Sequence, residues 1–229
     1  PNQPPWYPLN SEGNRGTGKT MTIRQAMAQS VNSITAQVMQ QLGAENVAEF
    51  AYRMGIQSKI DPVPSLCLGT SEMNLFEMVG AYSTYVNNGI FTEPIFITRI
   101  EDKNGNVIEN FIPKTKQAIN EQTAYKMIYM LRGGTEEERG SALGLPREVR
   151  VDNEVGGKTG TTNDASDGWF IGVTHNLVGG AWVGGDERAV RFPSWPFGQG
   201  SRSALPIFGK FLAKVYADPK IGVTKGQFR

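Results

Sequence analysis

Cysteine and histidine are scarce in this 229-residue chain, which contains one of each, Cys67 and His175. A single cysteine excludes an internal disulfide bond and a cysteine metal cluster. The single histidine falls in a predicted turn between two strand-like runs, and this position argues against a Ser-His-Asp catalytic triad. Any acid–base chemistry is therefore expected to depend on other side chains.

Neither sign of charge predominates, and long apolar runs are missing. The chain has 23 Lys and Arg against 22 Asp and Glu, a formal net charge of +1. It lacks the basic surface typical of nucleic-acid-binding proteins, so no nucleic-acid partner is expected. No run is long enough for a membrane-spanning helix, and no signal peptide is present. With 39% hydrophobic residues over 229 positions, the composition predicts one large domain or two small ones.

An initiator methionine is also missing. The chain begins with a proline-rich run, Pro1–Pro8, and residues 1–20 have the composition of a loop. We interpret this beginning as a point inside a longer protein.

Residues 155–162 form the most distinctive stretch, a glycine-rich run in which Lys158 is followed by small and hydroxyl side chains. Two β-branched and aromatic runs follow at 168–174 and 177–183, separated by a short turn at His175, which predicts a tight antiparallel hairpin. The Lys158 run would then be a strand whose edge can receive an extended peptide, while the lysine attracts a carboxylate. An ordinary glycine-rich strand with a surface lysine fits the same pattern.

Helical periodicity dominates the first part of the chain. Helices are predicted at residues 21–42, 44–54, 72–87, 121–132 and 203–217. A hairpin is predicted at 90–112, with its turn at Asn104-Gly105, and antiparallel strands are predicted at about 155–161, 169–174 and 177–184. This order of elements predicts an α+β fold, an antiparallel β-sheet flanked by helices.

Gly13–Thr20 fits G-x-x-x-x-G-K-[ST], the phosphate-binding P-loop pattern. A P-loop leaves a buried strand, however, and the residues before Gly13 are rich in proline and contain no apolar run. A nucleotide-binding module at Gly13–Thr20 stays open as an alternative.

Ser30-Val31-Asn32 places two polar residues inside the helical pattern of residues 21–42. Serine and asparagine side chains compete with helical hydrogen bonds, so a break at this point would present both of them together. Alternatively, Ser30 and Asn32 lie on a solvated helix face.

Ser30-Val31-Asn32, and Lys158-Thr159-Gly160-Thr161 much later in the chain, resemble the second and third motifs of the penicilloyl-serine transferases, which are the penicillin-binding proteins and serine β-lactamases. Further stretches resemble class A (bifunctional) penicillin-binding proteins: Trp6–Asn10, Leu68–Glu72, Gly157–Asn163 and Asp167–Phe170. No glutamate-containing loop can be assigned to deacylation, which disfavours a β-lactamase. The resemblance covers nearly the whole chain.

The resemblance implies a peptidoglycan D,D-transpeptidase domain. Such a domain cross-links stem peptides that end in D-Ala-D-Ala through an acyl-serine intermediate, and it binds β-lactams. Catalytic roles are implied for Ser30 in relaying a proton, for Asn32 in binding the substrate amide, and for Lys158 in supplying positive potential.

The resemblance also implies a substrate-binding strand. Thr159 and Thr161 would bind the substrate carboxylate, the Thr161 N–H would form half of an oxyanion hole, and Gly160 would leave room for the substrate. Ser30 Oγ and Lys158 Nζ are then expected within hydrogen-bonding reach or one water apart. No metal and no cofactor is implied.

The sequence departs from the family in one respect. No serine is followed by a lysine three residues later, so the S-x-x-K motif of the nucleophile is missing. We therefore expect residues 1–229 to be the C-terminal portion of a transpeptidase domain, inactive alone, with the S-x-x-K segment upstream.

The implied partners are stem peptides, β-lactams and that upstream part of the same protein. The membrane would be reached only through an N-terminal anchor of the parent protein, and the location would be extracytoplasmic. A non-catalytic peptidoglycan-binding domain that has lost the nucleophile is a further alternative.

Overall fold

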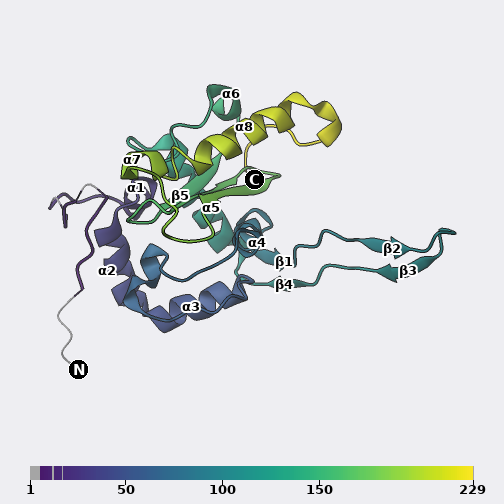
Figure 1. Ribbon diagram of the computed structural model, residues 1–229, viewed down its shortest axis with the longest axis horizontal. Helices are drawn as coiled ribbons and strands as arrows, with labels where there is room; N and C mark the ends of the chain where they lie inside the picture. Colours follow the sequence, from purple (N-terminus) through teal and green to yellow (C-terminus); the bar gives the residue numbers. More distant parts are fainter. Residues whose placement is uncertain (1–5, 12, 17, 229) are drawn as a thin grey trace.

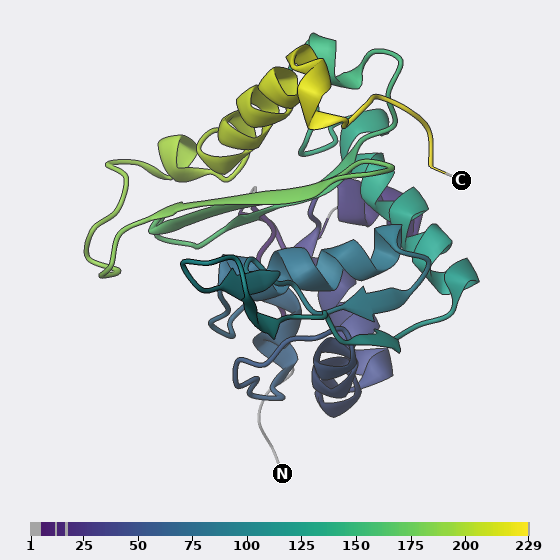
Figure 2. The ribbon, with the colours of Figure 1, turned by 90° about the vertical axis from the view of Figure 1, so that its right-hand side faces the viewer.

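The computed structural model describes residues 6–11, 13–16 and 18–228. An antiparallel sheet lies in the middle, with helix α8 (Ala204–Ala217) on one face and the helices between residues 23 and 136 on the other (Figures 1 and 2). This arrangement confirms the predicted α+β fold. Within the described residues, no helix is both long and apolar enough to cross a bilayer.

The described part of the chain forms a three-stranded sheet with the strand order β5-β6-β7, in which both neighbouring pairs are antiparallel. The strands are β5 (Gly156–Thr161), β6 (Asp167–Val173) and β7 (Val178–Gly184). His175 lies in the short β6–β7 turn, so the predicted strands and turn are confirmed. Because β5 is paired only with β6 among the described strands, its other edge is open.

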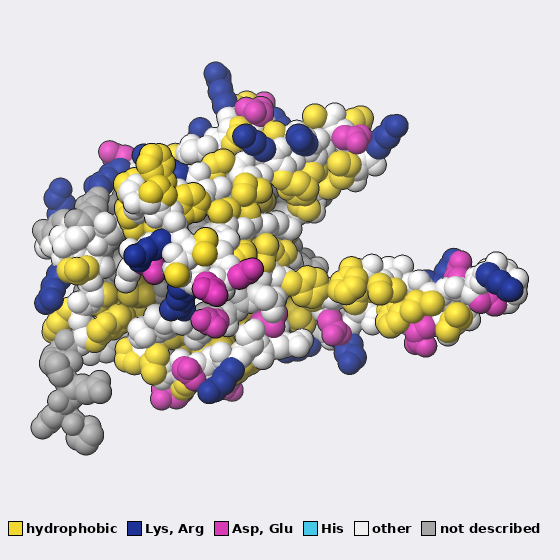
Figure 3. Space-filling model, viewed as in Figure 1, with side chains coloured by type: hydrophobic (Ala, Val, Ile, Leu, Met, Phe, Trp, Pro, Cys, Tyr) yellow, Lys and Arg dark blue, Asp and Glu magenta, His cyan; other side chains and the backbone are white. Residues whose placement is uncertain are grey.

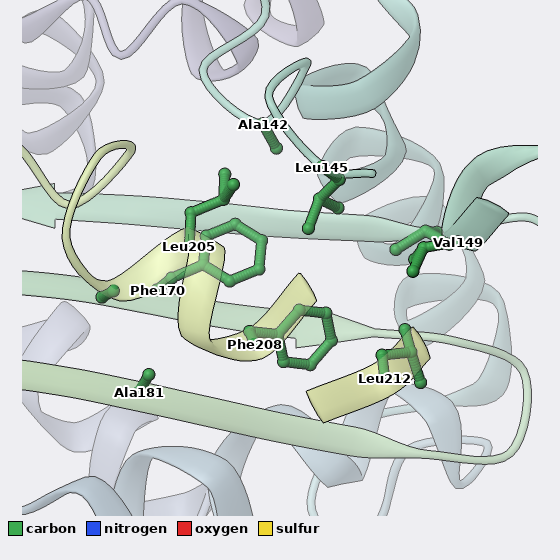
Figure 4. Packing of buried hydrophobic residues seen from close by; sticks show 10 residues of the cluster. Ala142, Leu145, Val149, Phe170, Ala181, Leu205, Phe208 and Leu212 are labelled. Carbon is green, nitrogen blue, oxygen red and sulfur yellow. The ribbon is translucent and has the colours of Figure 1, made fainter. Parts of the chain in front are cut away.

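Helix α8 covers one face of the sheet through a core of aromatic and aliphatic side chains. Phe208 of α8 lies beside Phe170 of β6 (Figure 4), with ring centroids 5.2 Å apart, and Leu212 of α8 belongs to the same cluster. Phe170 and Leu212 are fully buried. Burying one such side chain stabilises a fold by roughly 1.5–3 kcal/mol, so this core holds the sheet firmly against α8.

Helices α1 to α5 build the layer on the opposite face. They are α1 (Ile23–Ala28), α2 (Asn32–Leu42), α3 (Ala44–Arg53), α4 (Leu75–Val86) and α5 (Glu121–Glu136). Helix α5 continues one turn past its predicted end at residue 132. Glycines there allow the helix to pack closely: a Cβ on Gly134 would lie 2.9 Å from the carbonyl oxygen of Gly157. Close packing on β5 thus outweighs the low helix propensity of glycine.

A hairpin arm projects from this layer (Figures 1 and 3). Strands β1 (Ile90–Thr92) and β4 (Thr115–Gln117) pair at its base, and β2 (Arg99–Glu101) and β3 (Val107–Asn110) pair toward its tip. The turn at Asn104-Gly105 is confirmed, while the β1–β4 pair extends the hairpin beyond the predicted 90–112. The remaining short elements are 3-10 turns at Pro64–Leu68 and Pro219–Ile221, α6 (Arg147–Arg150) and α7 (Trp195–Gly198).

Candidate active site

Ser30 lies at the break between α1 and α2, where the backbone turns through a left-handed residue. Its φ is 58°, a conformation that is uncommon outside glycine. Backbone hydrogen bonds from Ser30 N to Met27 O (3.1 Å) and from Val31 N to Ala26 O (2.9 Å) close the turn. The predicted break is therefore present, and it places the Ser30 side chain beyond the end of α1 rather than along a helix face.

Helix α1 is held in place by contacts to α5 and to the segment that follows α5. Arg24 forms ion pairs with Glu136 and Glu137 while only 12% of its side chain is exposed. Partly desolvated ion pairs of this kind are costly to break. Near the other end of α1, Ser141 N donates to Ala28 O at 2.8 Å. Contacts at both ends of α1 thus fix the helix, and with it the position of Ser30, which follows α1 in the chain.

Lys158 reaches Ser30 from strand β5. Its Nζ donates hydrogen bonds to Ser30 Oγ at 2.8 Å and to the backbone carbonyl of Thr159 at 2.9 Å. The first contact confirms the predicted approach of two residues that are far apart in the chain. Desolvation of the ammonium group lowers the pKa of Lys158 to about 8. At pH 7 the side chain is still mostly protonated, but it releases its proton more readily than a surface lysine.

The pleat of β5 places the side chains of the K-T-G-T motif on two faces of the sheet. Thr159 pairs with Phe170, which belongs to the α8 core, whereas Lys158 pairs with Ile171, which faces α4. Directly paired residues share a face, so Lys158 points toward the helical layer while Thr159 and Thr161 point toward α8. One ligand can therefore meet Lys158 and the threonines together only at the open edge of β5.

Thr161 and Gly160 lie at the end of β5. Thr161 is exposed, and its Oγ1 accepts a hydrogen bond from Gly200 N at 3.0 Å. Gly160 has no side chain to cover the strand, and a Cβ there would lie 3.1 Å from Trp169 Cβ. The end of β5 is thus accessible from outside while its backbone stays closely packed. Sequence reasoning missed Gly200, which lies in a loop without periodicity.

Asn32 is the first residue of α2 and lies two positions after Ser30. Its Nδ2 donates to the carbonyl of Leu9 at 2.8 Å, which ties α2 to the segment before α1. Among the described residues, no hydrogen bond joins Asn32 to Ser30 or Lys158. The structure therefore shows a direct contact between Ser30 and Lys158. Asn32 is linked to this pair only because it lies two positions after Ser30 in the chain.

A polar cluster in the turn between β5 and β6 was not predicted. Ser166 Oγ lies 2.7 Å from Asp167 Oδ2 and 3.0 Å from Thr162 Oγ1, and Trp182 Nε1 donates to Asp167 Oδ1 at 2.9 Å. The cluster fixes the turn that immediately follows Thr161. The hydroxyl- and carboxylate-rich composition of residues 162–167 was the signal that could have revealed it.

The nucleotide-binding alternative at Gly13–Thr20 is not supported. Residues 6–11, 13–16 and 18–20 contain no helix or strand, as predicted for a loop, whereas a P-loop follows a buried strand. The helix after it, α1, has only 6 residues. Thr17 of this run lies outside the described residues, as do Pro1–Pro5 of the proline-rich start.

Replacing Lys158 by methionine is expected to stabilise the folded state by about 1–3 kcal/mol at pH 7, because the change removes a desolvated charge. The pKa of Lys158 is about 8 in the fold and about 10.4 in an unfolded chain. The cost of burying the ammonium group is therefore fully present below pH 8 and disappears as the pH rises to about 10.4.

Denaturant unfolding at pH 7 and pH 10 measures this effect, in a cooperatively folding protein that contains residues 1–229. The gain from Lys158→Met should shrink at pH 10. Lys210→Met, at an exposed lysine of α8, is the matched control and should show no such change. An equal gain for Lys158→Met at both pH values would contradict the expectation.

Comparisons with known proteins agree with this geometry. Residues 2–183 match the family model described as the penicillin-binding protein transpeptidase domain. Penicillin-binding protein 1A of Aquifex aeolicus is 34% identical over 212 residues, covering 92% of this chain and 27% of that protein. Penicillin-binding protein 1A of Rickettsia felis is 32% identical over 247 residues, covering 95% of this chain and 29% of that protein. The chain thus spans less than a third of the length of these relatives.

Solved structures have a similar fold. Penicillin-binding protein 1A from Haemophilus influenzae superimposes with a TM-score of 0.83 at 24% identity, over 95% of this chain and 37% of that one. The PonA1 protein from Mycobacterium tuberculosis, in complex with penicillin V, superimposes with a TM-score of 0.75 at 23% identity, over 96% of this chain and 61% of that one. At these identities the similarity is one of fold.

Proposed function

Because this chain belongs to the penicillin-binding protein transpeptidase family, we propose that residues 1–229 form one half of a peptidoglycan D,D-transpeptidase site that also binds β-lactams. The observation behind the proposal is the 2.8 Å hydrogen bond from Lys158 Nζ to Ser30 Oγ. This bond links the Lys158 ammonium group, whose pKa is lowered to about 8, to the Ser30 hydroxyl, next to the open edge of β5. Acyl transfer needs such a proton relay and positive potential close to the bound substrate.

The nucleophilic serine and its lysine come, in this proposal, from an S-x-x-K segment outside residues 1–229. That serine attacks the carbonyl of the penultimate D-Ala of a stem peptide and forms an acyl-serine. The terminal D-Ala leaves as an amine that must gain a proton. An amine of a neighbouring stem peptide then attacks the acyl-serine and completes the cross-link.

Ser30 is suited to supply the proton that the leaving amine needs. Its Oγ accepts a hydrogen bond from Lys158 Nζ, so its own hydroxyl proton remains available for donation. Lys158, with a pKa of about 8, can return a proton to Ser30 near neutral pH. The pair thus acts as a relay whose two members depend on each other.

The substrate carboxylate lies, in this proposal, along the open edge of β5. At that edge the carboxylate contacts the Lys158 ammonium group, which lies on one face of the sheet, and the Thr159 and Thr161 hydroxyls, which lie on the other. The Thr161 N–H forms half of the oxyanion hole, and loss of one such donor typically costs about 3 kcal/mol. Asn32 uses its Nδ2 on Leu9, which leaves its Oδ1 to accept from the substrate amide.

The activity and location of the longer protein that contains these residues, called the parent protein below, belong to the same proposal. It acts on stem peptides ending in D-Ala-D-Ala at the extracytoplasmic side of the membrane, to which an N-terminal anchor outside this span attaches it. A non-catalytic peptidoglycan-binding protein would share the open edge of β5 but lack the nucleophile. The sequence upstream of Pro1 distinguishes the two, because only the enzyme needs S-x-x-K.

The test measures acylation of the parent protein by a fluorescent penicillin. Ser30→Ala and Lys158→Met are each expected to lower the acylation rate by about 10²–10³-fold, since general acid–base groups contribute on this scale. The double variant should be no slower than the slower single variant, because the two residues act as a unit. Lys210→Met, at an exposed position on α8, is the matched control and should react normally. An unchanged rate in Lys158→Met would refute the proposal.

A further inference from the structure

The loop that leads into α8 makes one hydrogen bond to the proposed carboxylate site. Gly200 N donates to Thr161 Oγ1 at 3.0 Å, across 39 positions of sequence. Gly200 is itself held by the start of the helix, because its carbonyl accepts from Leu205 N at 2.8 Å. Ser203 N and Ser203 Oγ both donate to the Gln199 carbonyl, at 2.9 Å each. The donor is therefore part of a rigid turn rather than of a free loop.

This turn packs directly on the backbone of the sheet. A Cβ on Gly200 would lie 2.4 Å from the carbonyl oxygens of both Gly160 and Trp169. A Cβ on Gly168 would lie 2.1 Å from Ser203 Oγ. Real Cβ atoms do not approach backbone oxygens so closely, so only glycine fits at position 200, whereas at position 168 the Ser203 hydroxyl would have to move. The Gly200 N–H is thus fixed relative to β5 by the close packing of Gly200 on the backbone of Gly160 and Trp169.

The hydrogen bond restricts what the Thr161 hydroxyl can do. A hydroxyl has one proton to donate, and it accepts through its lone pairs. Because Oγ1 accepts from Gly200 N, the proton must point away from Gly200. Among the described residues, none accepts that proton, and Thr161 is exposed at the open edge of β5. The hydroxyl thus uses one lone pair on Gly200, and its proton is left to point toward the open edge, where a carboxylate can accept it.

We propose that Gly200 is a positioning residue whose N–H turns the Thr161 hydroxyl proton toward the open edge of β5, so that this edge favours ligands bearing an anionic carboxylate over neutral analogues. The inference rests on the proposed function, because it assumes that a carboxylate binds beside Thr161. Without this partner the proton could also point toward residue 200, and the hydroxyl would then present only lone pairs to the carboxylate. Charge-assisted hydrogen bonds are stronger than neutral ones, so a proton directed toward the open edge favours an anionic ligand.

The test compares acylation of the parent protein by benzylpenicillin and by its neutral methyl ester. The ratio of the two rates measures selection for the carboxylate. A backbone ester at position 200 (Gly200→glycolate) removes the N–H without adding a Cβ, and it is expected to lower the ratio about tenfold while the rate with the methyl ester changes little. Thr161→Val should lower the ratio as much, and Thr161→Ser should retain it. Gly222→glycolate is the matched control, because Gly222 N makes a similar backbone hydrogen bond, to Pro219 O at 3.3 Å, in an exposed turn.

The outcomes separate this inference from the proposed function. If Thr161→Val lowers the ratio but Gly200→glycolate leaves it unchanged, the role of Gly200 is overturned and the carboxylate site stands. If Thr161→Val also leaves the ratio unchanged, both are overturned. If the backbone ester prevents folding, hydrogen exchange of the Gly200 amide in the Thr161 variants tests the inference instead. The amide is expected to exchange slowly in Thr161→Ser and faster in Thr161→Val, and equal rates would overturn the inference.

Discussion

Incubation of the 229-residue chain with a β-lactam is expected to leave its mass unchanged. None of its serines is followed three residues later by a lysine, so the activated nucleophile of the family is missing. Ser30 accepts a hydrogen bond from Lys158 Nζ, but Lys158, with a pKa of about 8, is mostly protonated at pH 7 and is therefore a poor base for the Ser30 hydroxyl. Residues 1–229 then supply only the electrostatic and hydrogen-bonding half of the site, and that half cannot form a covalent bond.

Intact-mass spectrometry after incubation with excess benzylpenicillin measures this result. The parent protein, which on our proposal contains S-x-x-K, is the positive control and should gain one penicilloyl group. A stoichiometric adduct on Ser30, or on any other serine of residues 1–229, would show that the nucleophile lies within this span. The roles that we propose for Ser30 and for the upstream segment would then both be wrong.

The isolated chain is also expected to unfold without a sharp transition and to bind a dye that recognises apolar surface. Large side chains are exposed on several elements, among them Ile23 at 61%, Ile207 at 51% and Phe211 at 50%. Ile207 and Phe211 are one turn apart on the outer face of α8, as expected of a face that packs on another element. Each such side chain stabilises a fold by roughly 1.5–3 kcal/mol when buried, whereas a domain is stable by only about 5–15 kcal/mol.

The open edge of β7 adds to this expectation. Among the described strands β7 pairs only with β6, and an unpaired edge invites association with other chains. The family resemblance implies that two further strands come from outside residues 1–229. An upstream segment, or an oligomer, would then cover these surfaces and raise the free energy of unfolding to that of an ordinary domain.

Thermal unfolding followed by circular dichroism, with dye fluorescence in parallel, measures the second prediction in dilute solution. The double variant Ile207→Gln and Phe211→Gln should lower dye binding without lowering stability, because these side chains are exposed. Phe208→Gln is the matched substitution at a buried position, with Phe208 only 2% exposed, and it should destabilise the chain strongly. A monomer that unfolds cooperatively and binds no dye would show that residues 1–229 form a complete domain.

The sheet and the last helix could be predicted from the sequence because their signals are local. Alternation of side chains and the short turn at His175 predicted β6 and β7, and the spacing of Phe208, Phe211, Leu212 and Val215 predicted α8. The contact between Ser30 and Lys158 could not be obtained from periodicity. It was predicted only because both motifs resemble those of one family.

Other features could not be predicted because no local pattern encodes them. The Gly200 contact arises from backbone packing, and a glycine in a loop gives no sign of what lies against it. Strands β1 and β4 have 3 residues each, too few for alternation to be visible. Gly133 and Gly134 suggested the end of a helix, but tertiary packing of α5 on its neighbours overrides their low propensity.

The Ser30–Lys158 contact joins two layers of the fold, so on the proposed function substitutions in either layer can change the reaction with β-lactams. Ser30 is placed by the packing of α1 on α5, where a Cβ on Gly133 would lie only 3.3 Å from Ala28 Cβ, while Lys158 is placed by the sheet. A larger residue at that interface would push α1 away from α5, displace Ser30 from Lys158 and so lengthen the contact without changing either partner. On the proposed function, lower β-lactam susceptibility would then also arise at positions other than Ser30 and Lys158, so a survey of resistant variants needs to include the whole α1–α5 interface.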